Sequence, residues 1–199
     1  MSSIEILRQL LTQLRTADTD LSIFEARFHR YQLNPCLTED EVQAFERRSN
    51  VILPDDYRQF LLQVGNGGVG PGYGMLKFVW KDWGEAIAIG KSYEEGTFPN
   101  NIPAYFLLEK EELTRGITLP LADYGCGMTA QLVVTGKRRG KVWFISAEND
   151  TLPFGQGLCN HLHGGSAEEF MMEVEEAFSF YEWYRDWLVN SLAELGVNV

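Results

Sequence analysis

The stretch from Leu53 to Leu76 constrains the fold more than any other part of the chain, because it encodes the start and the end of a short helix. Pro54 suits the first helical position, where its missing N–H and fixed φ cost nothing, and the two aspartates that follow complement the positive end of the helix dipole. Four apolar residues fall at i, i+3, i+4 and i+7 and form one stripe: Tyr57, Phe60, Leu61 and Val64. Gly65 would then supply the left-handed residue that ends many helices. The pattern predicts a buried helix that anchors the fold.

The loop after this helix has glycine at six of the ten positions 65–74, and its first six residues match G-x-G-x-x-G. A dinucleotide site needs these glycines after a strand and before a helix, so that the helix N-terminus holds the pyrophosphate. Here they follow a helix, at its negative end, which repels phosphate. Gly70 is followed by Pro71 and Gly72 rather than by the Lys-Ser/Thr of a Walker loop, which also excludes that motif here. The loop is instead predicted to be a tight turn rich in left-handed residues, leading into a strand that begins near Met75.

Composition narrows the class of protein. A chain of 199 residues with 45% hydrophobic and 13% aromatic residues is long enough and apolar enough for one packed domain. The net charge of −11 argues against binding to nucleic acid or to an anionic membrane surface, and it suits a basic protein partner. We expect no secretion signal and no membrane span, and the three cysteines, never spaced as CxxC, fit a reduced, cytoplasmic protein.

The hydrophobic pattern predicts helices in the first third of the chain, then strands, then one long helix. The predicted helices cover residues 4–15, less regularly 20–31, a segment that begins at the Thr38/Glu41 capping box, the Pro54 helix, and 167 to about 195 after a Ser166/Glu169 capping box. The predicted strands cover 75–80, 85–90 and 117–122, with a hairpin that pairs 129–135 with 141–146, and 91–115 reads as an irregular insertion.

This order predicts an α+β fold: a mainly antiparallel sheet with N-terminal helices and one long C-terminal helix packed against it. We expect a single domain over residues 1–199, with a core at about 37–195 and a helical extension at about 1–35.

Four motifs in sequence order resemble the SUKH superfamily, which includes fungal cell-wall assembly regulators and many bacterial immunity proteins. They are Thr38-x-x-Glu41, Leu53-Pro-Asp-Asp-Tyr-Arg-Gln-Phe-Leu, Asn66-Gly-Gly, and Gly-Lys-Val-Trp at 140–143. The resemblance covers about residues 37–190. It implies a non-catalytic α+β domain that needs no cofactor, whose commonest bacterial use is to bind and neutralise a cognate toxin, often a nuclease. The alternative is a regulatory or scaffold module of the cell-wall regulator type. The shared residues are mainly fold residues, so the resemblance assigns no partner-binding residue.

The best candidate for a partner surface is a stripe on the predicted long helix, beside its principal core stripe. The core stripe comprises Phe170, Val174, Phe178, Tyr181, Leu188 and Leu192. The candidate stripe is acidic in its first half and aromatic in its second: Glu169, Glu173, Glu176, Phe180, Trp183 and Trp187. Aromatic residues are enriched among binding hot spots, and carboxylates speed encounter with a basic toxin. In the alternative interpretation, the leucine face of helix 4–15 covers the aromatic half. An exposed stripe would equally suit a homodimer.

Other patterns favour structural roles. Cys159, His161 and His163 would share one face of a strand, but no companion ligand motif accompanies them. Cys126 lies between two glycines, as a turn residue would, and the carboxylates Asp18, Asp20, Glu148 and Asp150 show no pairing that would make a catalytic dyad. A basic spot at Lys137, Arg138, Arg139 and Lys141 is either a solvated hairpin turn or a contact for an acidic segment. We therefore predict no catalytic residue and no metal site.

Overall fold

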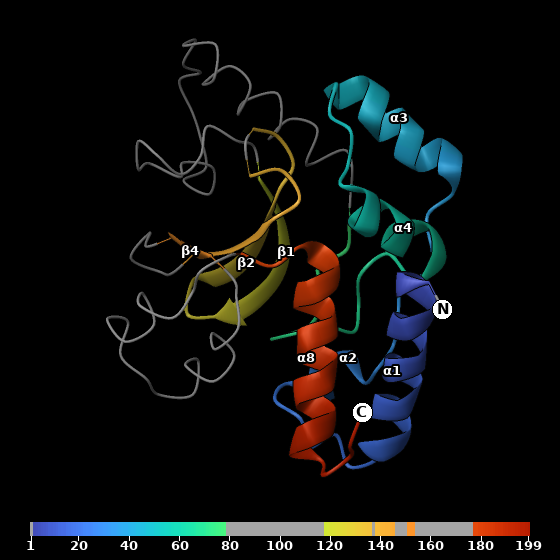
Figure 1. Ribbon diagram of the computed structural model, residues 1–199, viewed down its shortest axis with the longest axis vertical. Coiled ribbons are helices and arrows are strands. Elements are labelled where there is room, and N and C mark those ends of the chain that lie inside the picture. Colours follow the sequence, from blue (N-terminus) through green and yellow to red (C-terminus); the bar gives the residue numbers. More distant parts are fainter. Residues whose placement is uncertain (1, 79–117, 137, 146–150, 154–176) are drawn as a thin grey trace.

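The computed structural model describes residues 2–78, 118–136, 138–145, 151–153 and 177–199 (Figure 1). The helices are α1 (Ser3–Ala17), α2 (Ala26–His29), α3 (Glu39–Ser49), α4 (Asp55–Gln63) and α8 (Phe180–Glu194). The strands are β1 (Thr118–Gly125), β2 (Met128–Val133), β3 (Val142–Ile145) and β4 (Thr151–Pro153). They form one antiparallel sheet in the order β1-β2-β3-β4, and α8 lies between this sheet and α1 in Figure 1. The predicted α+β class is confirmed.

The N-terminal helices follow the predicted start signals closely. At the start of α3, the Thr38 hydroxyl accepts from the Glu41 N–H and the Glu41 carboxylate accepts from the Thr38 N–H at 2.7 Å. Pro54 is the N-cap of α4 rather than its first helical residue. The less regular segment 20–31 forms only the four residues of α2.

Gly65 does not have the left-handed conformation that the sequence predicts. The helix ends at Val64 with right-handed φ and ψ, and the positive φ values come later in the loop, at Gly67, Gly68, Gly72 and Gly74. Gly65 is needed for a different reason, since a Cβ there would lie 2.9 Å from the Asn34 carbonyl oxygen. The predicted turn rich in left-handed residues is confirmed. Its first glycine, Gly65, has a different role, because the absence of a Cβ lets the Asn34 backbone approach closely.

The glycine loop connects the N-terminal region to the sheet. Isolated antiparallel bridges join Leu33 to Gly68, Gly68 to Met75, and Met75 to Ala122 in β1. Backbone pairing therefore extends from β1 to Met75, from Met75 to Gly68, and from Gly68 to Leu33. The predicted strand near Met75 is confirmed only as this bridge, and the strand predicted at 85–90 lies outside the described residues.

The predicted hairpin is confirmed, with Thr129–Leu132 of β2 opposite Val142–Ile145 of β3. Next to its turn, the Val142 N–H donates to the Phe178 carbonyl at 2.8 Å, and Lys141 bridges to Ser179. The chain just before α8 is therefore attached to the edge of β3. The sequence pattern missed strand β4.

The prediction of one continuous helix from 167 to 195 is wrong. Ala177 and Phe178 are not helical, and α8 begins after Ser179. The Ser179 hydroxyl accepts from the Glu182 N–H at 3.2 Å, and the Glu182 carboxylate accepts from the Ser179 N–H at 2.7 Å. This capping box starts a new helix where the preceding residues pair with β3. The Ser166/Glu169 capping box lies outside the described residues.

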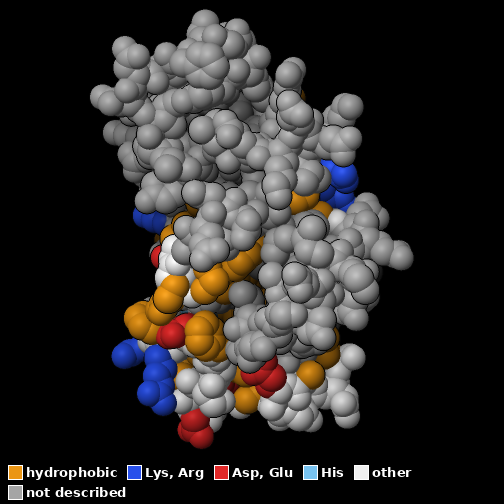
Figure 2. Space-filling view, turned by 90° about the vertical axis from the view of Figure 1, so that its left-hand side faces the viewer, with side chains coloured by type: hydrophobic (Ala, Val, Ile, Leu, Met, Phe, Trp, Pro, Cys, Tyr) orange, Lys and Arg blue, Asp and Glu red, His pale blue; other side chains and the backbone are white. Residues whose placement is uncertain are grey.

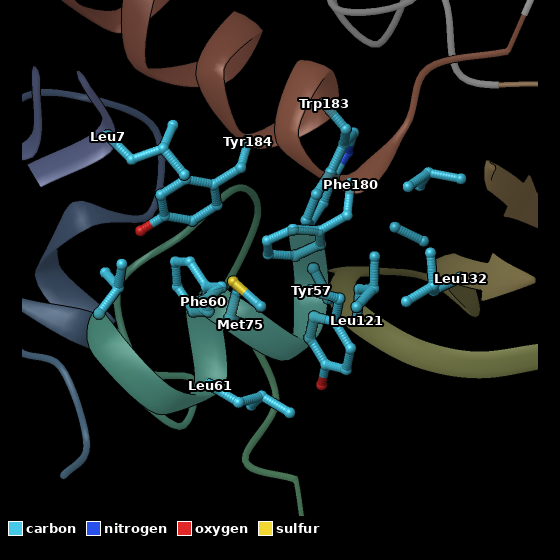
Figure 3. Close-up of a cluster of buried hydrophobic side chains, with 14 of the residues drawn as sticks. Leu7, Tyr57, Phe60, Leu61, Met75, Leu121, Leu132, Phe180, Trp183 and Tyr184 are labelled. Carbon is cyan, nitrogen blue, oxygen red and sulfur yellow. The ribbon is translucent and has the colours of Figure 1, made fainter. Parts of the chain in front are cut away.

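Aromatic rings from α4 and α8 fill the centre of the core (Figure 3). The ring of Phe180 lies 4.9 Å from that of Tyr57 and 5.1 Å from that of Phe60, and Phe60 lies 5.0 Å from Tyr184. The buried Tyr184 hydroxyl donates to the Val69 carbonyl at 2.9 Å, so its one polar atom is satisfied. The leucine face of α1 joins the same core and packs against α8.

Candidate protein-binding surface

The structure places the aromatic half of the predicted stripe largely in the core. Phe180 is 0% and Trp183 is 2% exposed, so these two rings cannot meet a partner at the surface, contrary to the prediction. Their hydrophobic faces pack inside the molecule, against each other and against Tyr184. Trp187 is partly exposed and packs against His29 and Tyr184. The acidic half, comprising Glu169, Glu173 and Glu176, lies outside the described residues.

Cys126 occupies the turn between β1 and β2, where it is exposed and has a left-handed φ of 52°. This position agrees with its interpretation as a turn residue. Cys159, His161 and His163 lie outside the described residues. Within the described residues, no group of three or more His, Cys, Asp or Glu side chains could hold a metal ion, and no helix is long and apolar enough to cross a membrane.

Part of the basic spot has a structural role. The Arg139 guanidinium donates to the carbonyl of Leu53 at 2.9 Å and to that of Ile52 at 3.1 Å. It thereby ties the β2–β3 turn to the start of α4. Lys141 lies near Glu182, where its charge helps to lower the pKa of that carboxyl after the larger effect of the Ser179 N–H. Lys137 lies outside the described residues.

A surface that the sequence did not single out lies on the segment 21–31. Four of its residues have positive φ although none is glycine: Leu21, Glu25, Arg30 and Tyr31. Such conformations cost on the order of 1 kcal/mol or more each and persist only where the surroundings hold them, which is common at functional sites. The segment is therefore a strained loop that contains only the short helix α2, rather than the longer helix that its pattern favoured.

Asp18 holds this loop in place. Its carboxylate is 2% exposed and accepts from the Ser22 N–H at 2.7 Å, the Ser22 hydroxyl at 2.8 Å, the Ile23 N–H at 3.2 Å and the Tyr31 hydroxyl at 2.6 Å. A buried carboxylate needs several donors of this kind to offset its desolvation. Asp18 therefore joins both ends of the loop, and it does not form a catalytic pair with Asp20.

The loop presents large aromatic side chains to solvent. Phe24 is 53% and Phe28 is 66% exposed, and the ring of Phe28 meets that of Tyr73, itself 39% exposed, edge to face at 4.9 Å. We call Phe24, Phe28 and Tyr73 the aromatic surface. Figure 2 shows exposed hydrophobic side chains gathered beside Lys and Arg side chains on the lower part of one face. Exposed aromatic residues on a rigid support are typical of protein-binding sites.

Two arginines on the same loop, Arg27 and Arg30, are exposed beside these rings. Neither forms an ion pair with another described residue. A cavity of about 390 Å³ borders the aromatic surface and is lined by residues 21–25, Arg27 and Phe28. The sequence did contain a trace of this site, since two phenylalanines four residues apart alternate with two arginines. This spacing does not by itself predict a surface, because it suits an ordinary amphipathic helix equally well.

Comparison with known families identifies the core of the chain. The SMI1 / KNR4 family (SUKH-1) model matches residues 36–186. The chain belongs to this family. Comparison with the curated proteins and with the solved structures gives no significant match. The SUKH match includes α3, α4, the described strands and the first half of α8. Phe24 and Phe28 lie outside it, whereas Tyr73 lies inside, so the aromatic surface spans the boundary between the SUKH region and the N-terminal extension.

Proposed function

We propose that this SUKH protein is a cytoplasmic immunity protein that neutralises a cognate toxin by binding it, without catalysing a reaction. The aromatic surface is the observation that supports this function best. Phe24 and Phe28 project from a loop that Asp18 already holds in one conformation, and Phe28 packs against Tyr73, so little ordering entropy would be lost on binding. Aromatic side chains on such a support are well suited to be binding hot spots.

Neutralisation would need only a tight complex that blocks the toxin. An interface of about 800 Å² on each partner is sufficient to occlude a substrate groove. The net charge of −11 would accelerate encounter with a basic toxin such as a nuclease, whose groove normally holds phosphates. In this proposal Glu169, Glu173 and Glu176 supply part of that attraction, and Trp187 contributes its exposed edge.

The decisive experiment is co-expression with each toxin candidate encoded beside this gene. We expect one candidate to be lethal alone, harmless with this protein, and co-purified with it. Absence of both rescue and binding for every neighbour would overturn the proposal. Binding without rescue would instead identify a regulatory or scaffold module.

Variants then test the surface. Phe28→Ala and Tyr73→Ala should each weaken toxin binding by about 1–2 kcal/mol, roughly five- to thirtyfold in Kd, in isothermal titration calorimetry. Ile52→Ala is the matched control, because Ile52 is also an exposed apolar side chain (69%) but lies between α3 and α4. Equal loss of affinity in the control would exclude a specific role for the aromatic surface. Sedimentation equilibrium of the free protein would show whether the same rings mediate a homodimer.

A further inference from the structure

A groove of about 1060 Å³ runs along α1, separate from the aromatic loop residues Phe24 and Phe28. One wall is the exposed face of α1, and the other consists of residues 31–33, Cys36 and the end of α4. The lining residues are Arg8, Leu11, Thr12, Arg15, Thr16, Tyr31, Gln32, Leu33, Cys36, Gln63 and Val64. The Arg8 guanidinium donates to the Gln63 carbonyl and thereby joins the two walls.

The wall of this groove includes the last segment of the extended sheet. Leu33 is bridged to Gly68 through two hydrogen bonds of its neighbours, from the Asn34 N–H to the Gly67 carbonyl at 3.0 Å and from the Val69 N–H to the Gln32 carbonyl at 2.9 Å. In this pattern the N–H and C=O of Leu33 itself point away from Gly68. Neither forms a hydrogen bond with another described residue. An edge with an open donor and an open acceptor is a template for an added strand.

The charge of the groove is opposite to that of the whole chain. Among the described residues that line it, only Arg8 and Arg15 are charged, whereas the chain carries a net charge of −11. Arg15 is exposed and has no ion-pair partner among the described residues. The two arginines are seven residues apart, about 10 Å along the helix. Alternate side chains of a strand are about 7 Å apart, so carboxylates two to four residues apart in an extended segment would reach both.

We propose that this groove binds an extended acidic segment of a partner protein, which adds a strand beside Leu33 and places its carboxylates against Arg8 and Arg15. Backbone pairing would give affinity, and the two guanidinium groups would select acidic sequences. This binding mode does not depend on toxin neutralisation. It uses residues other than the aromatic surface, and its partner segment is acidic whereas the proposed toxin is basic.

The test uses the full chain and fluorescein-labelled peptides in fluorescence anisotropy. We expect the peptide (Glu-Val)4 to bind saturably and more tightly than the neutral (Gln-Val)4. An N-methylated form of (Glu-Val)4, which lacks backbone donors, should bind much more weakly. In hydrogen exchange followed by NMR, (Glu-Val)4 should slow exchange of the Leu33 amide.

Charge reversal provides the matched comparison. Arg15→Glu should weaken binding of (Glu-Val)4 by about tenfold, whereas Arg47→Glu in α3, which changes the net charge equally but lies outside the groove, should leave it nearly unchanged. Both residues are exposed, and thermal melting of each variant checks that the fold is retained. The proposal is overturned if (Gln-Val)4 or the N-methylated peptide binds as tightly as (Glu-Val)4, or if the two charge reversals have the same effect.

Discussion

Asp18 and Tyr31 form a buried donor–acceptor pair that keeps its protonation state over the physiological pH range. Burial favours a higher pKa for Asp18, but the hydrogen bonds from Tyr31, Ser22 and Ile23 outweigh it, and the pKa lies below its ordinary value. Burial and the contact with Asp18 raise the pKa of Tyr31. The hydroxyl therefore stays a donor and the carboxylate an acceptor. This pair helps to hold the strained loop in one conformation.

His29, beside this pair, should make stability depend on pH. Burial lowers its pKa to about 4, against the opposing effect of the Asp18 charge, whereas the unfolded chain has the ordinary value near 6.5. The unfolded state thus binds the proton first, so the contribution of His29 to the free energy of unfolding should be complete well above pH 6.5 and fall by roughly 1–3 kcal/mol as pH decreases toward 4. Urea unfolding across this range measures it. His29→Leu should remove this part of the slope, and an unchanged slope would contradict the assignment.

Trp183 gives a second prediction at this scale, because its burial decides between a core and a surface role. Replacing a ring that is 2% exposed should cost about 3–5 kcal/mol through lost burial and a residual cavity. For a chain of this length, Trp183→Ala should then lower Tm by roughly 10 °C or more in calorimetry. Trp187→Ala, at the partly exposed end of the same helix, should cost less. A Tm near that of the unaltered protein would contradict the core role of Trp183 and favour a role at the surface.

At the scale of elements, three helices begin with the same reciprocal hydrogen bonds: Ser2 with Glu5, Thr38 with Glu41, and Ser179 with Glu182. The Ser179 box is the one that divides the C-terminal region, because it follows residues that pair with β3. The local Ser179/Glu182 capping box and the long-range contact with β3 therefore both favour a helix that begins after Ser179.

Ser179→Ala should destabilise the protein by about 1 kcal/mol, the usual cost of losing an N-cap hydroxyl. Since the same cap fixes the residues that bridge to Lys141, exchange of the amide of Val142 should also accelerate. Ser2→Ala removes an equivalent cap at the free end of α1 and is the control for the long-range effect. Faster exchange at Val142 in both variants would argue against a link between the cap and the sheet.

These helix starts also show how far the sequence could predict the structure. The leucine pattern of residues 4–15, the Thr38/Glu41 capping box, the Tyr57 stripe and the turn residues of the β2–β3 hairpin are local signals. They predicted α1, α3, α4 and the hairpin correctly. The end of α4 and the start of α8 depend on distant partners, namely Asn34 beside Gly65 and β3 beside Phe178. The aromatic surface could not be predicted because Asp18 holds its loop by tertiary hydrogen bonds, and Tyr73 joins it from a separate loop.

At the scale of the whole molecule, the segments outside the SUKH match complete the core instead of standing apart from it. The match covers residues 36–186, which leaves out α1 and the second half of α8. These two segments pack against each other, and their buried residues belong to the same cluster as Tyr57 and Leu132. Both the aromatic surface and the acidic-peptide groove depend on this addition, since Phe28 and Arg15 lie in the extension.

If the extension and the SUKH region form one cooperative unit, equivalent core truncations in each should have equivalent effects. Leu14 in α1 and Leu61 in α4 are both 0% exposed, so Leu14→Ala and Leu61→Ala should each cost about 2–5 kcal/mol. Each variant should still unfold in a single transition that is the same by circular dichroism and by tryptophan fluorescence. Loss of α1 packing would uncover buried side chains of α8, and for this reason the two regions should not melt separately. An early transition in Leu14→Ala alone, with the main transition at its original temperature, would show instead that the extension is a separate unit docked on a stable SUKH domain.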